Sequence, residues 1–237
     1  MSVEEAKPVP APGTAIDMLL RPDQKGWNVL QLARLEASKQ SARFLLKHMV
    51  TAKPFPAGRQ LLEYAVNLAL EDARDTDHYL EFGVASGRTI NCIADVSKRK
   101  VYGFDSFDGL PEDWTFAYPK GRFAGQLPKV RDNVELVVGW FTDTLPKFAA
   151  GLPKDATVGF LHVDCDLYSS TVTVLWQLAP FMRDGTVIVF DEYFNYVGWK
   201  QHEHKAFKEF LKTFGYRAEY LAFVPVHQQV AVRIHKL

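Results

Sequence analysis

The sequence predicts an α/β fold built on one mostly parallel sheet of seven strands, and three observations lead to this prediction. From residue 78 onward, short runs rich in β-branched and aromatic residues alternate with amphipathic stretches of helical period. The 237 residues, 47% of them hydrophobic, suffice for one substantial core. The last two runs are joined only by residues 224–228, a link too short for a crossover helix, so we expect them to form an antiparallel hairpin.

The first 75 residues precede this alternating pattern. Residues 1–14 are rich in proline and hold little that can pack, so we expect a flexible arm. Residues 15–75 carry two helical patterns, at about 28–48 and 58–72, which we expect to form a cap or lid. The main domain would then comprise residues 76–237.

Within the main domain the expected elements follow one another at short intervals. Strands are expected at about 79–82, 101–104, 134–138, 158–163, 186–190, 217–223 and 229–234. Helices fit between them at about 89–97, 142–149, 170–182 and 203–214. The insert at 108–132 is rich in proline and glycine and predicts a loop over the carboxyl edge of the sheet, where open α/β sheets bind ligands.

The composition narrows the class of partner. Lys plus Arg and Asp plus Glu both number 28, so the net charge provides no attraction toward nucleic acid or an anionic membrane. No apolar run approaches the ~18 residues of a membrane span, and the N-terminus lacks the pattern of a signal peptide. We expect a cytoplasmic protein, a monomer or a homo-oligomer, with a small-molecule partner. Cys92 and Cys165 lack the spacing of a metal or redox pair and predict buried free thiols.

A turn after the first long strand suggests a cofactor site. Gly83 and Gly87 allow a ligand to lie against the main chain, and Ser86 between them can donate a hydrogen bond. Asp105 ends the next strand, 24 residues after Glu81, where a carboxylate can accept the two hydroxyls of a ribose. These residues together predict an adenosyl ligand.

The spacing of the turn favours S-adenosylmethionine over a dinucleotide. A pyrophosphate requires the pattern G-x-G-x-x-G, whereas three residues separate Gly83 from Gly87, and Glu81 would repel a phosphate. The same acid favours the ammonium and sulfonium groups of S-adenosylmethionine. The alternative is a glycine turn that packs helix on strand, with Asp105 solvated. The terminal hairpin also favours the Rossmann-like fold of class I methyltransferases, with residues 76–237 as the domain that binds S-adenosylmethionine.

Two further segments are candidates for the same pocket. Ser106 and Phe107 follow Asp105 directly, and Trp140 and Phe141 follow the strand at 134–138. An aromatic ring at that position can lie against adenine. Ordinary core packing explains Trp140 and Phe141 equally well.

Acidic residues follow two neighbouring strands at the same edge. Asp164 and Asp166 come after the strand at 158–163, and Asp191 and Glu192 come after the strand at 186–190. Because adjacent parallel strands end side by side, four carboxylates should converge, and a hard divalent cation such as Mg²⁺ would relieve their repulsion. Such a cation can hold an acceptor hydroxyl and lower its pKa. The alternative is that Asp164 and Asp166 cap the helix that begins near residue 170.

Three histidines lie near these acids in the sequence. Asp166 or His202 can take the proton of an acceptor hydroxyl, since both residue types accept protons near neutral pH when suitably placed. We expect His204 to face solvent at the start of the helix at 203–214. His162 is expected to be a core histidine within its strand.

Four motifs, spread over most of residues 79–195, resemble those of the macrocin-type O-methyltransferases of antibiotic biosynthesis. They are EFGVxSG at 81–87, YGFDSFDGLP at 102–111, GWFxDTLP at 139–146 and DxDLYxST at 164–171. The resemblance implies a metal-dependent enzyme that methylates sugar hydroxyls on natural products or related phenolic scaffolds. It also implies that Asp164 and Asp191 bind the metal, that Glu192 holds a third ligand position usually filled by Asp, and that Asp166 is a candidate base.

The sequence therefore favours an S-adenosylmethionine-dependent O-methyltransferase acting on a sugar or a natural-product scaffold. A nicotinamide-dependent oxidoreductase is a second candidate, and the glycine spacing and Glu81 argue against it. A protein that binds the cofactor without turnover is a third.

Overall fold

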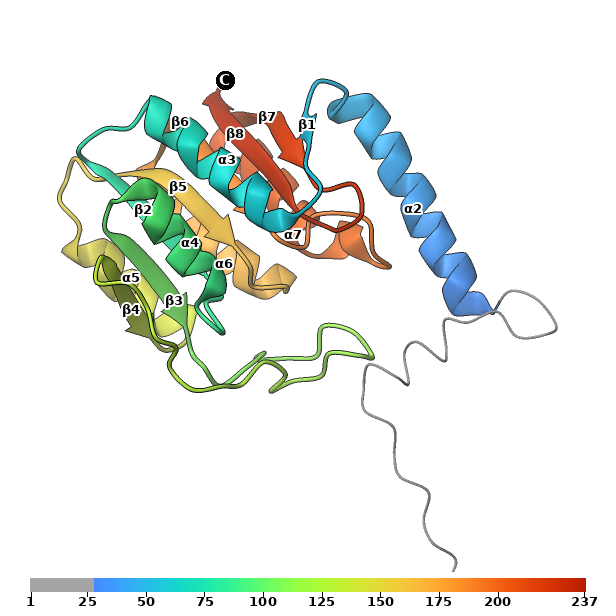
Figure 1. Cartoon of the computed structure of the whole chain (residues 1–237), viewed down its shortest axis with the longest axis horizontal. Coiled ribbons are helices and arrows are strands. Elements are labelled where there is room, and N and C mark those ends of the chain that lie inside the picture. Colours follow the sequence, from blue (N-terminus) through green and yellow to red (C-terminus); the bar gives the residue numbers. More distant parts are fainter. Residues whose placement is uncertain (1–27) are drawn as a thin grey trace, which may run out of the picture.

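A computed structural model describes residues 28–237, so the predicted flexible arm at 1–14 and the start of the expected cap lie outside the described residues. Within residues 28–237, one sheet of eight strands is covered by helices on both faces (Figure 1). The predicted α/β class is confirmed.

Seven strands correspond to those predicted from the sequence, and an eighth was not predicted. The spatial order is β1-β7-β8-β6-β5-β2-β3-β4. Strands β6, β5, β2, β3 and β4 are parallel, and β8 runs antiparallel to both β6 and β7, which confirms the terminal hairpin. The unpredicted β1 has only two residues and no strand pattern. The bounds are β1 (Lys53–Pro54), β2 (Asp77–Phe82), β3 (Val101–Asp105), β4 (Val134–Val138), β5 (Thr157–Val163), β6 (Met182–Phe190), β7 (Tyr216–Phe223) and β8 (Val230–Lys236).

The helices form two layers around the sheet. α3 and α4 cover one face, and α5, α6 and α7 cover the other (Figure 1). The bounds are α2 (Val29–His48), α3 (Gly58–Glu71), α4 (Arg88–Ser97), α5 (Phe141–Gly151), α6 (Tyr168–Leu178) and α7 (Glu203–Phe214), with short 3₁₀ turns η1 (Ala179–Phe181) and η2 (Trp199–Gln201). The helix expected to reach residue 182 stops at Leu178, because Pro180 has no N–H to continue its hydrogen bonds.

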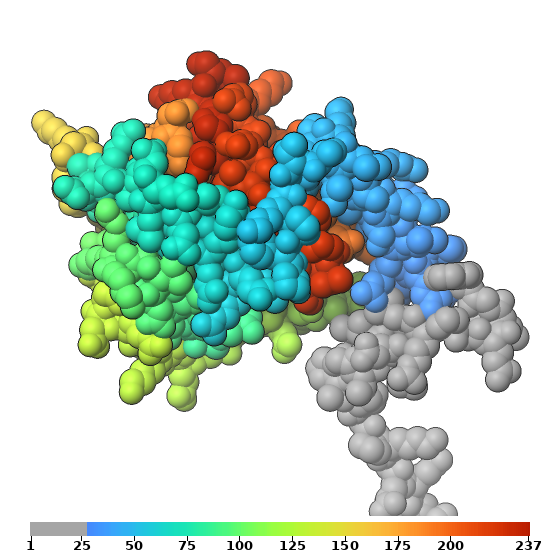
Figure 2. Space-filling view, turned by 45° about the horizontal axis from the view of Figure 1, so that its top comes forward, coloured from blue at the N-terminus to red at the C-terminus, as the bar shows by residue number. Residues whose placement is uncertain are grey.

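Helix α3, which we expected to form part of the cap at residues 15–75, packs against the sheet of the main domain. Its apolar face is buried against the sheet, with Leu61, Ala65 and Val66 fully buried. In the space-filling view α3 and α4 form one continuous surface, while α2 lies beside the C-terminal strands (Figure 2). Only α2 remains a candidate for a cap, since helix α3 is needed to cover the core.

Two further expectations concern the cysteines and membrane-spanning segments. Cys92 and Cys165 are buried and free, as predicted. No helix in residues 28–237 is both long and apolar enough to cross a bilayer.

His204 does not face solvent as expected. Its ring is 6% exposed and packs against Phe44, Tyr193 and Trp199 at centroid distances of 5.2, 5.2 and 4.6 Å. The pattern of residues 203–214 gave no sign of this, because the covering residue Phe44 comes from α2, far away in the sequence. Burial lowers the pKa of His204 to about 3.

Acidification should therefore destabilise the protein through His204. Below pH ~6.5 the unfolded chain binds a proton at this residue, whereas the folded chain does not until the pH approaches 3. Stability is lost as the pH falls through this window, by about 2 kcal/mol between pH 7 and pH 5. His204→Phe should lose about 2 kcal/mol less than wild type over this range, measured by urea unfolding at both pH values.

The exposed His227 provides the control. His227→Phe should retain the pH dependence of the wild type. An equal loss of stability in His204→Phe and wild type would contradict the assignment.

Candidate active site

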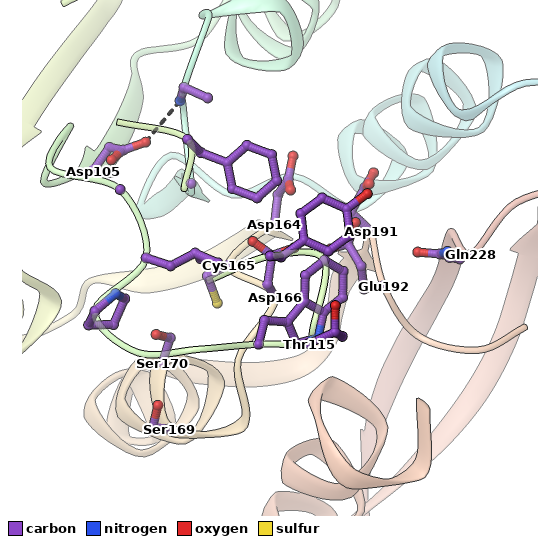
Figure 3. A pocket seen from close by; sticks show the side chains of 18 of the residues that line it. Asp105, Thr115, Asp164, Cys165, Asp166, Ser169, Ser170, Asp191, Glu192 and Gln228 are labelled. Atoms are coloured by element: carbon purple, nitrogen blue, oxygen red, sulfur yellow. Dashed lines mark hydrogen bonds between the residues drawn. The ribbon is translucent and has the colours of Figure 1, made fainter. Parts of the chain in front are cut away.

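A cavity of about 920 Å³ opens at the carboxyl edge of the parallel strands (Figure 3). Its walls come from the turns that follow β2, β3, β5 and β6, from residues of the insert at 108–132, and from Leu30 and Arg34 of α2. The insert thus lies where the sequence predicted it. Open α/β sheets bind ligands at this edge because successive loops converge there.

Main-chain hydrogen bonds fix the start of each of these turns. The Gly83 N–H donates to the Phe104 carbonyl at 3.0 Å, the Asp164 N–H to Phe82 at 2.8 Å, and the Asp191 N–H to Val163 at 2.9 Å. The sheet ladder therefore extends one residue beyond β2, β5 and β6. As a result, Asp164 and Asp191 project from rigid positions beside the glycine turn.

The glycine turn is tied to Asp105 before any ligand binds. Asp105 Oδ2 accepts hydrogen bonds from the main-chain N–H groups of Val84 and Ala85 at 2.9 and 2.8 Å, and Oδ1 accepts one from Phe107 at 2.8 Å. A carboxylate has about four acceptor positions, so Oδ1 retains room for one more donor. Asp105 lines the cavity, and one ribose hydroxyl, but not two at separate oxygens, fits this arrangement.

Gly83 is required for the shape of the turn. Its φ is +92°, and a Cβ at this position would collide with the carbonyl group of Asp164. Gly87, with φ +76°, precedes α4 and closes the turn by donating to the Val84 carbonyl at 2.8 Å. Gly83 therefore allows close approach to the Asp164 carbonyl, whereas Gly87 forms the N-terminal cap position of α4.

The predicted cofactor residues divide into two groups. Those that line the cavity are Gly83, Asp105, Ser106, Trp140, Phe141 and Asp164. Those that do not are Glu81, Ser86, Gly87 and Phe107. Trp140 is 37% exposed, which favours a ligand contact over core packing, whereas Phe141 both lines the cavity and packs edge-on against Phe82 at 5.3 Å.

Glu81 lies beneath the turn, so the expected direct contact of its carboxylate with the cofactor is not found in this structure. The side chain is fully buried, and Oε1 is 2.8 Å from His162 Nδ1. The two residues are direct partners in the pairing of β2 with β5. His162 is indeed buried, at 1% exposure, but it links Glu81 to the acidic turn instead of only filling the core.

The four predicted acids gather along one side of the cavity, across from Asp105 (Figure 3). Asp166 has a φ of +61°, a strained value for a residue other than glycine. Helix α6 begins at Tyr168 without a side-chain cap, so the alternative that Asp164 or Asp166 caps this helix is wrong. These carboxylates are directed into the cavity instead of toward the helix.

Burial and mutual repulsion change the protonation of these acids. Desolvation raises the pKa of Asp166 to about 7, with the Asp191 charge as a further cause. Burial, followed by the neighbouring acids, also raises the pKa of Asp164, Glu192 and Glu203 well above the usual range. A carboxyl group with a pKa near 7 is suited to exchange a proton with a substrate at neutral pH.

The residues best placed to hold a metal ion differ from the predicted set. His162, Asp164 and Asp191 each offer a ligand atom, and these atoms lie within 4.8 Å of one another. Glu192 is not among them. It lines the cavity, but its main-chain N–H is bound to Glu203 Oε2 at 3.0 Å, and its Oε2 has no partner within the described residues.

His202 lies behind the wall of the cavity and does not line it. Its ring is 6.3 Å from those of Trp114 and Tyr196, and burial lowers its pKa. Trp114 and Tyr196 themselves face the cavity and escaped the sequence analysis. The only available signal was the presence of aromatic residues in two segments without regular structure.

The region that forms this site is similar to known proteins. Residues 80–193 match a family model described as a methyltransferase domain. A tetracenomycin-C 4'-O-methyltransferase of Streptomyces olivaceus is 29% identical over 56% of this chain and 58% of its own length. The demethyldecarbamoylnovobiocin O-methyltransferase of Streptomyces niveus is 33% identical over 42% of this chain and 44% of its own length. The chain thus spans less than two thirds of either relative.

A solved structure extends the likeness of fold to nearly the whole chain. The calicheamicin methyltransferase CalS11 matches with a TM-score of 0.61 at 19% identity, over 97% of this chain and 99% of CalS11.

Replacing Gly83 should disrupt the site. Gly83→Ala places a Cβ against the Asp164 carbonyl and strains a backbone at φ +92°, so we expect at least tenfold weaker binding of S-adenosylhomocysteine, or about 1.4 kcal/mol, by calorimetry. Gly151→Ala, at the end of α5 with open space around it, is the matched control and should bind as wild type does. Unchanged binding in Gly83→Ala would mean that the ligand does not approach this turn.

Proposed function

We propose that this protein transfers a methyl group from S-adenosylmethionine to a hydroxyl group of a small molecule, because residues 80–193 match a family model described as a methyltransferase domain. The acceptor is proposed to be a sugar or a natural-product scaffold. The observation that carries the proposal is a single cavity with the glycine turn and Asp105 at one end and the buried carboxylate of Asp166 toward the other.

The cavity has the features that an adenosyl ligand requires. Gly83 has no side chain to keep a ligand from the main chain, and Asp105, whose Oδ1 can accept one more hydrogen bond, also lines the cavity. Trp140 lines the cavity with a ring that is 37% exposed. These groups fit a sugar hydroxyl and an aromatic base without any phosphate-binding pattern. When bound, S-adenosylmethionine supplies a methyl group already activated by its sulfonium.

The residues of the chain then have to align and deprotonate the acceptor. Asp166, with a pKa raised to about 7, can take the proton of a hydroxyl group that lies in the cavity. Asp164 and Asp191 are rigidly held by the extended sheet ladder and can orient that hydroxyl. Because methyl transfer is a single displacement, holding the two reactants in line provides much of the rate enhancement.

A divalent cation fits the excess of carboxylates at the same place, and Mg²⁺ is the ion that the sequence suggested. It would be held by Asp164 and Asp191, and its charge would lower the pKa of a hydroxyl bound to it. The buried acids support this proposal, because burial and the neighbouring acids raise their pKa, and a bound cation would stabilise their ionised forms.

The acceptor would lie against the insert and α2. The cavity wall there includes several aromatic side chains, and Arg34 also lines the cavity. Aromatic rings pack on the apolar faces of sugars and polyketide-like ring systems, which supports an acceptor of this class. These lining residues are Trp114, Phe116, Tyr118, Phe123 and Tyr196.

Substitution of the proposed base tests this function. Asp166→Asn should lower the rate of methyl transfer by about 10²–10⁴-fold, while S-adenosylhomocysteine binds with affinity within threefold of wild type. The rate is followed as transfer of isotope-labelled methyl to a panel of glycosides and phenolic natural products, with products identified by mass spectrometry.

His202→Gln is the comparison, because this residue lies outside the cavity. It should change the rate by less than Asp166→Asn does, by about threefold or less. A large loss in His202→Gln with normal activity in Asp166→Asn would reverse the assignment. Absence of S-adenosylhomocysteine binding to the wild type would exclude the proposed function.

A further inference from the structure

One ring nitrogen of His162 lies near the carboxyl groups of Asp164 and Asp191. Its Nδ1 is 2.8 Å from Glu81 Oε1, so this nitrogen already has a hydrogen-bond partner. The other nitrogen, Nε2, lies 4.0 Å from Asp191 Oδ1. That separation is too long for a hydrogen bond.

The three groups are spaced as ligands of one cation would be. The ligand atoms of His162, Asp164 and Asp191 lie within 4.8 Å of one another, and the imidazole ring is 1% exposed. Because nitrogen and oxygen can both bind a divalent transition metal, a cation between these groups would be held by all three. A buried acceptor, Glu192 Oε2, faces the same cavity without a hydrogen-bond donor among the described residues.

The contact between His162 and Glu81 resembles the hydrogen bond that commonly supports a metal-binding histidine. In such sites one ring nitrogen binds the metal, while the other N–H donates to a carboxylate that fixes the tautomer and the orientation of the ring. Here Glu81 provides that carboxylate, and the pairing of β2 with β5 holds both residues in place. A histidine that only fills the core would not need a buried carboxyl group beside it, as His162 has in Glu81.

We propose that the cation site of this protein consists of His162 Nε2, Asp164 and Asp191, and that Glu192 lies outside the direct coordination. The proposal rests on the cation suggested above for the proposed function, but it changes both the ligands and the metal. Because imidazole nitrogen favours Fe²⁺, Co²⁺ or Zn²⁺ and Mg²⁺ prefers oxygen alone, the site should select a borderline transition metal over Mg²⁺.

Gln229 supports the distinction between Asp191 and Glu192. Its Nε2 lies 3.1 Å from both oxygens of Asp191, which orients this carboxylate toward the interior of the site. Glu192 has no comparable side-chain donor in the described residues, and only its main chain is fixed. The ligands that are held in place are therefore the histidine and the two aspartates, as metal sites with supporting hydrogen bonds require.

The test uses Co²⁺ as the probe, with the wild-type full chain and no acceptor. Calorimetry should give Co²⁺ binding at least about tenfold tighter than Mg²⁺ binding. In proton NMR, the Nδ1–H of a Co²⁺-bound imidazole gives a paramagnetically shifted resonance in H₂O that disappears in D₂O. We expect one such resonance in the wild type.

Variants then assign the resonance. His162→Gln should abolish it and weaken Co²⁺ binding by at least about tenfold, whereas Glu192→Gln should retain it. Glu81→Gln keeps an acceptor for the Nδ1–H and should shift the resonance without removing it, which provides an answer even if His162→Gln does not fold. Far-ultraviolet circular dichroism checks the fold of each variant.

Several outcomes would overturn the proposal. No Co²⁺ binding, or binding without an exchangeable shifted resonance, would leave His162 only as the buried hydrogen-bond partner of Glu81. A resonance that Glu81→Gln does not move, or Co²⁺ binding lost in Glu192→Gln and kept in His162→Gln, would do the same. S-adenosylhomocysteine is titrated into the same samples, so failure of the metal site is distinguished from failure of the proposed function.

Discussion

The hydrogen bond between Glu81 and His162 joins the two halves of the site across adjacent strands. It is buried, spans β2 and β5, and lies directly beneath the glycine turn and beside the acidic turn. A buried carboxyl group is stable only when its hydrogen-bond partner is correctly placed, so the register of these two strands is strongly constrained. Gly83 lies two residues after Glu81, and Asp164 lies two residues after His162, so the register of the two strands also fixes the positions of Gly83 and Asp164.

The same register explains why the carboxylates are crowded. Parallel strands β2, β5 and β6 end at one edge, and each continues its ladder for one more residue. Acids that follow these strands are therefore brought together in a region with little water, where burial, with the Asp191 charge as a further cause, raises the pKa of Asp166 to about 7. A fold that is otherwise well packed thus carries an electrostatic cost at this edge, and such costs are typical of functional sites.

Asp105 and Gly83 illustrate how the glycine turn is preorganised. The turn is closed by hydrogen bonds from two main-chain N–H groups to Asp105, and its tightness depends on a glycine that approaches the Asp164 carbonyl. A ligand would meet a rigid surface and would not have to order the loop, which reduces the entropic cost of binding.

The sequence by itself determined the order of strands and helices, the terminal hairpin and the two candidate loops, because hydrophobic period and glycine spacing are local properties of the chain. It also brought Asp164, Asp166, Asp191 and Glu192 to one edge, since the edge follows from parallel topology. Only the tertiary structure decided the depth and partners of each side chain: that Glu81 is buried, that His162 faces the acids, that His204 lies beneath α2, and that His202 is outside the cavity. These depend on contacts between residues far apart in the sequence, and no local pattern records them.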